Sequence, residues 1–362
     1  MKIDHINNSS FWSKLKKPFI ALSPMDGVTD HPYRYIQKKY GQPDIIYTEF
    51  ATVEGFCRGV TVPLKDFIFD ETQRPIIAQI YGKTPQFFRE TAIVICQLGF
   101  DGIDINMGCP AKNVANGGAG AGLINTPKLA QEIVRATLAG IQDWENGKSA
   151  SDCENITPEI TQEVEKRHSN LPQKYQQRQA IPISIKTRIG YDRQIIDEWL
   201  PTLLETNPAA ITIHGRTLRQ GYKGKANWEI IKKAVKIAKK SSTLIIGNGN
   251  VASKAQALEK IKQSGVAGVL IGRASFGNPW IFNDNFSETK ITIHQKAQIA
   301  LEHAKLYEKT FCKDKKYSFL PMRKHLGWYI KGFNQAKEVR RKLMLTQNSQ
   351  DLKKILIHYK LS

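Results

Sequence analysis

Short apolar runs alternate along the chain with longer amphipathic stretches. Eight runs rich in β-branched residues end in polar residues, at positions 19–24, 44–50, 75–82, 102–108, 182–188, 210–215, 243–249 and 268–273. Nearly continuous apolar runs of this length are typical of parallel strands that helices cover on both faces. The repeated strand and helix pairs therefore predict an α/β protein built as a TIM barrel, (β/α)8.

Helices are expected between these strands. Two stretches open with Thr-Pro, which predicts N-caps at Thr84 and Thr126, each followed by a first-turn proline. Two more begin at Asn227 and Ser253 and carry apolar residues at helical spacing. Residues 51–74 do not fit a single helix, so this connection is expected to be irregular.

The strand ends supply polar side chains to one place, because active sites of TIM barrels form where the C-terminal ends of the strands meet. In chain order these ends offer Pro24 with Met25, Glu49, Gln79, Asn106, Lys186 with Arg188, His214, Asn248 and Arg273. The sequence thus predicts a polar cup above a hydrophobic barrel.

The last two strand ends have the composition of a phosphate site. Gly247, Gly249 and Gly272 allow backbone amides to approach an anion, and Arg273 can add a charged contact. Phosphate commonly binds after strands seven and eight of this fold. The alternative is that these glycines serve only the turns.

Lys186 and His214 leave adjacent predicted strands and are expected to share the cup. A cation beside a flavin stabilises the negative charge of the reduced ring. The alternatives are an ion pair of Lys186 with an acid such as Glu49, and a structural, hydrogen-bonded histidine at position 214.

Cys109 stands apart from the other cysteines. Gly108 frees the backbone before it and Pro110 ends the strand after it, which predicts a thiol on a loop above the mouth. An ordinary thiol has a pKa of about 8.5, so it is mostly protonated at neutral pH and can donate a proton. Cys96, by contrast, lies on the apolar stripe of a helix and is expected to be a small buried hydrophobe.

Composition excludes several classes of protein. The 362 residues are 41% hydrophobic, but no run approaches the about 18 apolar residues of a membrane span, and the N-terminus lacks the apolar segment of a signal peptide. Five cysteines without close pairing argue against a disulfide framework and favour the cytoplasm. The histidines and cysteines have no metal-ligand spacing, so no metal is expected.

Charge is concentrated at the C-terminal end. Of the net +20, residues 289–362 carry 17 Lys or Arg against 5 Asp or Glu. Apolar residues recur there at helical spacing, which predicts a basic helical domain over 287–362 that binds a polyanion. The alternative is a merely soluble basic surface. Residues 141–180, with 5 basic and 7 acidic residues, are expected to be a polar insertion into the barrel, partly helical or mobile.

Several motifs together resemble the flavin-dependent tRNA dihydrouridine synthases, most closely the bacterial B-type subgroup. They are SPMDGVTDHPYR (23–34), AQIYG (78–82), GFDGIDINMGCPAKNV (99–114), IKTRIG (185–190), ITIHGRT (211–217), NGN (248–250), IGRASFGNPWIF (271–282) and MRKHLGWYIKG (322–332). The likeness covers nearly the whole chain except the insertion. It implies an FMN-binding catalytic barrel over 1–286, followed by a tRNA-binding domain.

The resemblance also implies roles for particular residues. Cys109 matches the general acid of the family, and NADPH would reduce the flavin before a uridine flipped from tRNA stacks on it. The residues implied to bind FMN are Pro24, Met25, Gln79, Asn106, Lys186, His214, Asn248, Gly249, Asn250, Gly272 and Arg273. The residues expected to contact RNA are Lys112, Arg323, Lys324, Lys331, Arg340 and Arg341. We expect the protein to be a monomer that does not associate with a membrane.

Two departures from the family and three alternative functions remain at this point. The family commonly has Asp where this chain has Asn250, so the polar network below the phosphate is open. The insertion at 141–180 is also unusual for the family, and its role is open. Another FMN barrel, such as a dihydroorotate dehydrogenase or an ene-reductase, would act on small molecules and would not need the basic C-terminal region. A non-catalytic RNA-binding protein and an enzyme for ribosomal RNA are the other two, since phosphate contacts do not specify sequence.

Overall fold

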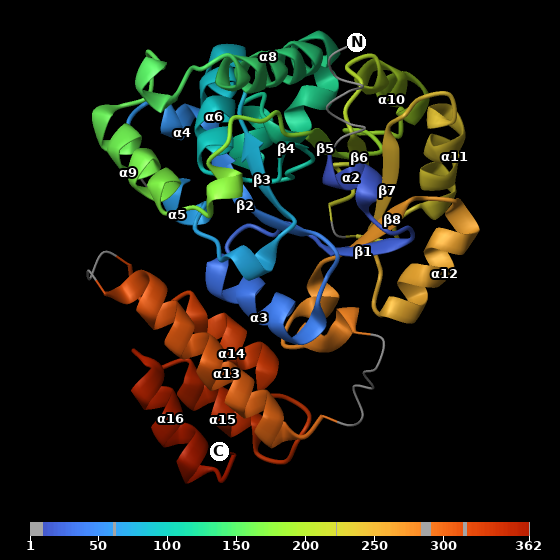
Figure 1. The fold of residues 1–362 in the computed structure, drawn as a ribbon. Helices are drawn as coiled ribbons and strands as arrows, with labels where there is room; N and C mark the ends of the chain where they lie inside the picture. Colours follow the sequence, from blue (N-terminus) through green and yellow to red (C-terminus); the bar gives the residue numbers. More distant parts are fainter. Residues whose placement is uncertain (1–9, 61–62, 222, 284–290, 314–316, 362) are drawn as a thin grey trace.

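The computed structural model describes residues 10–60, 63–221, 223–283, 291–313 and 317–361 (Figure 1). Eight parallel strands close into a barrel in sequence order, with β8 paired to β1. They are β1 (Phe19–Leu22), β2 (Ile46–Thr52), β3 (Ile76–Tyr81), β4 (Gly102–Met107), β5 (Ile183–Arg188), β6 (Ala210–His214), β7 (Leu244–Asn248) and β8 (Gly268–Ile271). The predicted TIM barrel is confirmed, and seven of the predicted runs contain their strand, while β2 extends two residues beyond the predicted run 44–50.

The connections between strands are mostly helical. The helices are α2 (Phe11–Lys14), α3 (His31–Gly41), α4 (Val53–Phe56), α5 (Pro63–Asp66), α6 (Pro85–Gln97), α7 (Lys112–Asn116), α8 (Pro127–Glu145), α9 (Pro158–Ser169), α10 (Ile196–Leu204), α11 (Trp228–Ala238) and α12 (Lys254–Ser264). The predicted caps Asn227 and Ser253 accept backbone N–H groups of Ile230 and Gln256. In the described part of the segment 51–74, the end of β2 is followed by α4, α5 and a 3-10 turn (Glu71–Gln73), so the expected irregular connection is confirmed.

Thr84 and Thr126 precede helices, but the prediction that their side chains cap them is wrong. Thr84 occupies the N-cap position of α6, but its side chain accepts no helix N–H group. The Glu54 carboxylate of α4 accepts the backbone N–H groups of Lys83 and Thr84 just before the helix, which fixes the approach of the chain to α6. Thr126 has φ −130° and ψ 64°, outside the extended backbone from which an N-cap side chain reaches the helix.

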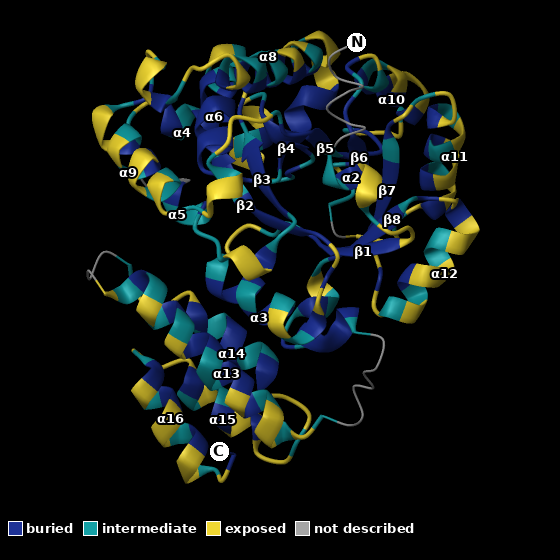
Figure 2. Cartoon of the chain, in the orientation of Figure 1, coloured by how far each residue is buried: buried dark blue, intermediate teal, exposed yellow. Residues whose placement is uncertain are grey.

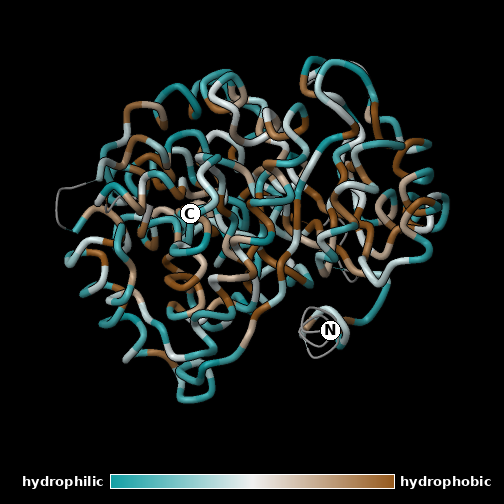
Figure 3. Tube along the Cα trace, turned by 90° about the horizontal axis from the view of Figure 1, so that it is seen from above, coloured by the Kyte–Doolittle hydropathy of each residue, from teal (hydrophilic) through white to brown (hydrophobic). Residues whose placement is uncertain are grey.

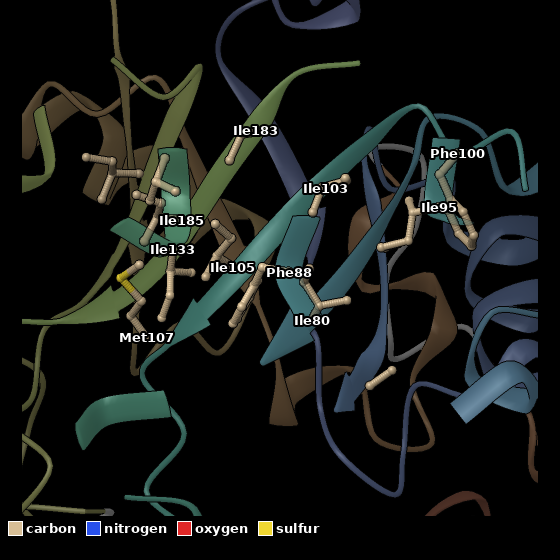
Figure 4. Packing of buried hydrophobic residues seen from close by; sticks show 14 of the residues in the cluster. Ile80, Phe88, Ile95, Phe100, Ile103, Ile105, Met107, Ile133, Ile183 and Ile185 are labelled. Carbon is tan, nitrogen blue, oxygen red and sulfur yellow. The ribbon is translucent and has the colours of Figure 1, made fainter. Parts of the chain in front are cut away.

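Strand alternation sorts the side chains into two cores. Ile103, Ile105 and Met107 of β4 point outward and pack with Phe88 of α6 and Ile133 of α8 (Figure 4). The strands are buried while the helices expose their outer faces (Figure 2), and hydrophilic segments form much of the periphery (Figure 3). A second cluster fills the barrel's lower interior, comprising Trp12, Phe19, Ala21, Ile45, Tyr47, Ile77, Ala209, Ala210, Ile246 and Leu270.

Residues 141–180 lie against the outside of the barrel rather than over its mouth. They contain the end of α8, all of α9 and two 3-10 turns. The buried Glu90 carboxylate of α6 accepts the Asn155 backbone N–H at 2.9 Å and the Asn155 Nδ2 at 2.8 Å. Gln97 Oε1 accepts the Ala150 N–H at 2.8 Å. Polar residues of α6 therefore fasten this segment to the barrel.

The C-terminal helices build a core of their own beside α3 (Figure 1). They are α13 (Ile293–Tyr307) with a π-helical turn (Glu308–Cys312), α14 (Met322–Tyr329), α15 (Ala336–Leu343) and α16 (Ser349–His358). The predicted domain boundary between 286 and 287 lies outside the described residues. Trp328 of α14 stacks on Phe276 after β8, with ring centroids 4.0 Å apart. Lys324 donates a hydrogen bond to the Gly27 carbonyl in the loop after β1. These contacts hold the bundle against loops at the barrel mouth.

A close approach of α6 and α8 gives a test of the packing. A Cβ added at Gly140 of α8 would lie 2.0 Å from the Arg89 carbonyl oxygen, so the backbone would have to shift. We expect Gly140→Ala to lower the free energy of unfolding by about 1–3 kcal/mol. At Gly327 of α14 a Cβ would meet only the Met344 Cε at 3.6 Å. Gly327→Ala is therefore expected to raise stability by up to about 1 kcal/mol through helix propensity. Urea unfolding of both variants measures the difference, and equal effects would contradict the packing.

Candidate active site

The barrel mouth opens into a cavity of about 1220 Å3. The structure brings together there every residue predicted to bind the cofactor, and Cys109 with them. These lining residues are Pro24, Met25, Gln79, Asn106, Cys109, Lys186, His214, Asn248, Gly249, Asn250, Gly272 and Arg273. Phe276, whose ring carries Trp328 of the C-terminal bundle, lines the same cavity. The residues of the predicted polar cup therefore line one cavity, while the role of each residue stays a prediction.

Lys186 lies on the cavity wall beside β4, where its Cα pairs in register with that of Asn106. Burial, together with the Arg188 charge, lowers the pKa of Lys186 to about 8, and Asp104 opposes this shift. Lys186 therefore keeps most of its charge at neutral pH. The alternative pairing with Glu49 is wrong, because that carboxyl lies among Asp30, Asp66 and Arg34, and burial raises its pKa to about 8.

His214, one strand further on, is neutral. Burial lowers its pKa to about 2, and the cations Lys186, Arg188, Arg216 and Arg273 act in the same direction. A neutral imidazole can both donate and accept a hydrogen bond. The cavity wall thus offers one cation and one neutral ring to whatever binds between them.

The loops after β7 and β8 close the far end of the cavity. Gly249 has φ +121°, and a Cβ there would lie 2.8 Å from His214 Cδ2, so only glycine fits. Asn250 Oδ1 accepts Arg216 Nη2 at 2.6 Å and the Ala226 N–H at 2.7 Å. An aspartate at position 250 could accept the same two hydrogen bonds with one of its carboxylate oxygens. Asn250 therefore keeps these contacts without the negative charge.

Cys109 is 7% exposed and sits on the loop that leaves β4. Asn106 Oδ1 accepts the Gly108 N–H at 3.0 Å and the Cys109 N–H at 2.9 Å, which fixes the loop against the strand end. Burial raises the pKa of the Cys109 thiol; a hydrogen bond from the Ala111 backbone opposes this rise, Asp26 adds to it, and the charges of Arg188 and Lys186 oppose it. At neutral pH the side chain is therefore a thiol that can donate a proton.

Sequence reasoning missed two buried polar residues of this region. Arg216 lines the cavity and is 2% exposed; it stands two residues after His214, a spacing that could have revealed it. Asp104 is fully buried beneath the cavity floor. It stands two residues before Asn106 on the same strand, and alternation along the strand puts both on one face.

The six predicted RNA-binding residues lie outside the cavity lining. Lys112 on α7, Lys331 and Arg341 are exposed, and Arg340 is half-buried. Arg323 donates to the Thr346 carbonyl at 2.8 Å, and Lys324 donates to the Gly27 carbonyl. Within the bundle, the exposed cations are therefore better placed to meet a polyanion than Arg323 and Lys324.

Metal ligands and membrane-spanning helices can be assessed in residues 10–60, 63–221, 223–283, 291–313 and 317–361. Among these residues, no group of three or more His, Cys, Asp or Glu side chains could hold a metal ion. The helices in the same part of the chain are all too short or too polar to cross a membrane.

Comparison with known proteins assigns the family. The sequence profile of the dihydrouridine synthases matches residues 21–142 and 162–361. The chain belongs to the dihydrouridine synthase family. A probable tRNA-dihydrouridine synthase of Staphylococcus aureus (strain MRSA252) is 34% identical over 96% of this chain and 94% of that protein. Probable tRNA-dihydrouridine synthase 2 of Bacillus subtilis (strain 168) is 31% identical over 96% of this chain and 95% of that protein.

Membership in the dihydrouridine synthase family confirms the resemblance, whereas the B-type subgroup stays a prediction. Among solved structures, a morphinone reductase in complex with tetrahydroNAD shares 12% identity and a TM-score of 0.43 over 73% of this chain and 85% of that chain. This likeness is too loose to bear on the site. The family profile skips residues 143–161, which fall inside the segment expected to be an insertion.

The raised pKa of Cys109 predicts how its reactivity depends on pH. Because burial disfavours the thiolate, alkylation of Cys109 by iodoacetamide should still be accelerating at about pH 9.5, where an ordinary thiol with a pKa of about 8.5 is almost fully ionised. Peptide mass spectrometry across a pH series measures the rate at each cysteine separately. A rate that levels off below pH 8 would contradict the burial of this thiol.

Proposed function

We propose that this protein is a tRNA dihydrouridine synthase that reduces the 5,6 double bond of uridines in tRNA with FMN and NADPH. The observation that carries the proposal is the placement of a protonated Cys109 at the rim of a deep cavity whose walls hold Lys186 and the neutral His214. Family membership and the names of the relatives support the substrate.

The cavity residues fit a flavin mononucleotide. A volume of about 1220 Å3 exceeds that of a drug-sized ligand site, leaving room for a flavin and a stacked base. Gly272 and Gly249 keep the loops after β8 and β7 free of side chains, and Arg273 stands beside them for a phosphate. Pro24 and Met25 offer an apolar surface for the ring, and Lys186 offers a cation for its pyrimidine edge.

The protein's own contribution to the reaction is a proton and its placement. A bound flavin supplies the hydride to carbon 6 of the uracil. The Cys109 S–H bond breaks as its proton goes to carbon 5, and the thiolate is reprotonated from water. A raised pKa suits this task, because the group must be protonated when the substrate arrives.

The C-terminal bundle is proposed to bind tRNA as a domain over 287–362, attached to a catalytic barrel over 1–286. Residues 289–362 hold 17 of the chain's basic residues against 5 acidic ones, and extrusion of a uridine costs a few kcal/mol that backbone contacts must offset. The bundle meets the barrel through Trp328 and Lys324 at the mouth, so RNA bound to it lies next to the cavity. We further propose that the protein works in the cytoplasm as a monomer.

Nucleoside mass spectrometry after incubation with NADPH tests the function. We expect dihydrouridine to appear in tRNA and not in ribosomal RNA. Cys109→Ala should lose most of the reduction, by a factor of about 100 or more, because a positioned general acid contributes on this order. Flavin binding and NADPH oxidation should persist in that variant. Cys153→Ser, outside the cavity lining, is the matched control and should retain activity. Undiminished reduction by Cys109→Ala would refute the proton-donor role.

Charge reversal tests the RNA surface. Lys331→Glu with Arg341→Glu should weaken tRNA binding at least tenfold and lower the dependence of affinity on salt, because each lost phosphate contact reduces counterion release. Lys232→Glu with Lys236→Glu on the exposed face of α11 of the barrel is the control with the same change of charge. Filter binding over a salt series measures both. An equal loss in the two pairs would mean that net charge alone acts.

A further inference from the structure

A buried carboxylate lies beneath the active-site cavity and takes no part in the proposed reaction. Asp104 of β4 is fully buried, and its two oxygens accept hydrogen bonds from neighbouring strands. Ser184 Oγ of β5 donates to Oδ1 at 2.6 Å, and Gln79 Nε2 of β3 donates to Oδ2 at 2.7 Å. Lys186 and Tyr47 are the titratable groups nearby.

The hydrogen bonds continue from Asp104 up to the cysteine loop. Gln79 Oε1 accepts Asn106 Nδ2 at 3.0 Å, and Asn106 Oδ1 accepts the N–H groups of Gly108 and Cys109. Gln79 is fully buried and Asn106 is 6% exposed, so water is a poor substitute for any of these partners. A continuous relay therefore joins the barrel floor to the backbone of the proposed general acid.

The donors and acceptors along this relay can be arranged in one way, and the groups at both of its ends require that arrangement. An ionised carboxylate only accepts, so Gln79 must turn its NH2 group toward Asp104 and its oxygen toward Asn106. Asn106 must then present its NH2 group to Gln79 and its oxygen to the loop. The two loop N–H groups require the same orientation, since a flipped Asn106 would set donor against donor.

The loop's carbonyl groups are held separately. Arg188 Nε donates to the Gly108 carbonyl at 2.7 Å, and the Ala121 N–H donates to the Cys109 carbonyl at 3.4 Å. The Asn106 oxygen is the acceptor that the structure gives to the two loop N–H groups. Release of Asn106 would thus free one side of the loop and leave the other side tethered.

We propose that Asp104 is a positioning residue for Cys109, acting through Gln79 and Asn106 to hold the cysteine loop in one place. The effect of this positioning on catalysis rests on the proposed function, in which Cys109 gives the proton. The positioning itself can be tested independently, because the alkylation rate of Cys109 is measured without RNA or NADPH.

Iodoacetamide labelling of the purified protein, resolved by peptide mass spectrometry, tests the relay. Asp104→Ala should raise the Cys109 labelling rate about tenfold and move the pKa of its alkylation down toward the ordinary thiol value, because the freed loop becomes hydrated. Ser184→Ala, which removes the other hydrogen bond of the same carboxylate, should change the rate less than twofold. Asp104→Asn keeps an oxygen for Gln79, with its NH2 group toward Ser184, and should restore slow labelling.

The buried Cys96 in the same digest separates a local effect from unfolding. Equal acceleration at Cys96 and Cys109 would overturn the proposal, and so would an Asp104→Ala variant that labels like the wild type or like Ser184→Ala. Failure of Asp104→Asn to restore slow labelling would overturn it too. Should Asp104→Ala not fold, Gln79→Leu cuts the relay one residue further along and must give the same selective exposure of Cys109. Labelling as predicted from a protein that makes no dihydrouridine would leave the relay standing and refute only the proposed function.

Discussion

Closure of the parallel barrel is the constraint on which the rest of the molecule depends. Closure leaves no strand edge, and alternation assigns every second side chain to the interior. The lower interior is filled by Trp12 of α2 and apolar residues such as Phe19, Ile77 and Leu270. Above them the inward positions become polar, and because all strands run the same way, these polar positions meet at one mouth. The site is therefore a consequence of register as much as of the individual residues.

A polar layer inside a protein needs internal partners, because unpaired buried groups are costly. The polar groups around Gln79 and Asn106 and those around His214 obtain their partners in different ways. Around Gln79 and Asn106, neutral amides are satisfied by a carboxylate below and backbone N–H groups above. Around His214, burial keeps the imidazole neutral and the nearby cations act in the same direction, while Arg216 donates to the uncharged Asn250.

The sequence could predict the strands and the members of the cup, since both follow from short-range patterns. Alternation and β-branched runs mark strands, and each strand's end marks the mouth. It could not predict interactions between side chains and backbone groups that meet only in the folded chain. Glu54 of α4 accepts the backbone N–H groups of Lys83 and Thr84 before α6, and no local pattern marks this contact. Glu49 was a plausible partner for Lys186, but an irregularity in the pairing of β2 with β3 between Tyr47 and Phe50 accompanies its placement beside Arg34.

The same limit explains why Asp104 escaped notice. Its position on the strand is readable, but its importance lies in two hydrogen bonds across three strands, and these exist only once the barrel has closed. A general acid must be protonated when the substrate arrives, and it must be held in position. Burial keeps the Cys109 thiol protonated, although Lys186 and Arg188 nearby favour the thiolate. The thiol must also be held in position, and a cation close enough to hold it would lower its pKa. The neutral amides of Gln79 and Asn106 hold the backbone of the cysteine loop, so they fix the position of the sulfur without adding a charge beside it. The charged member of the relay, Asp104, lies at the end away from the thiol.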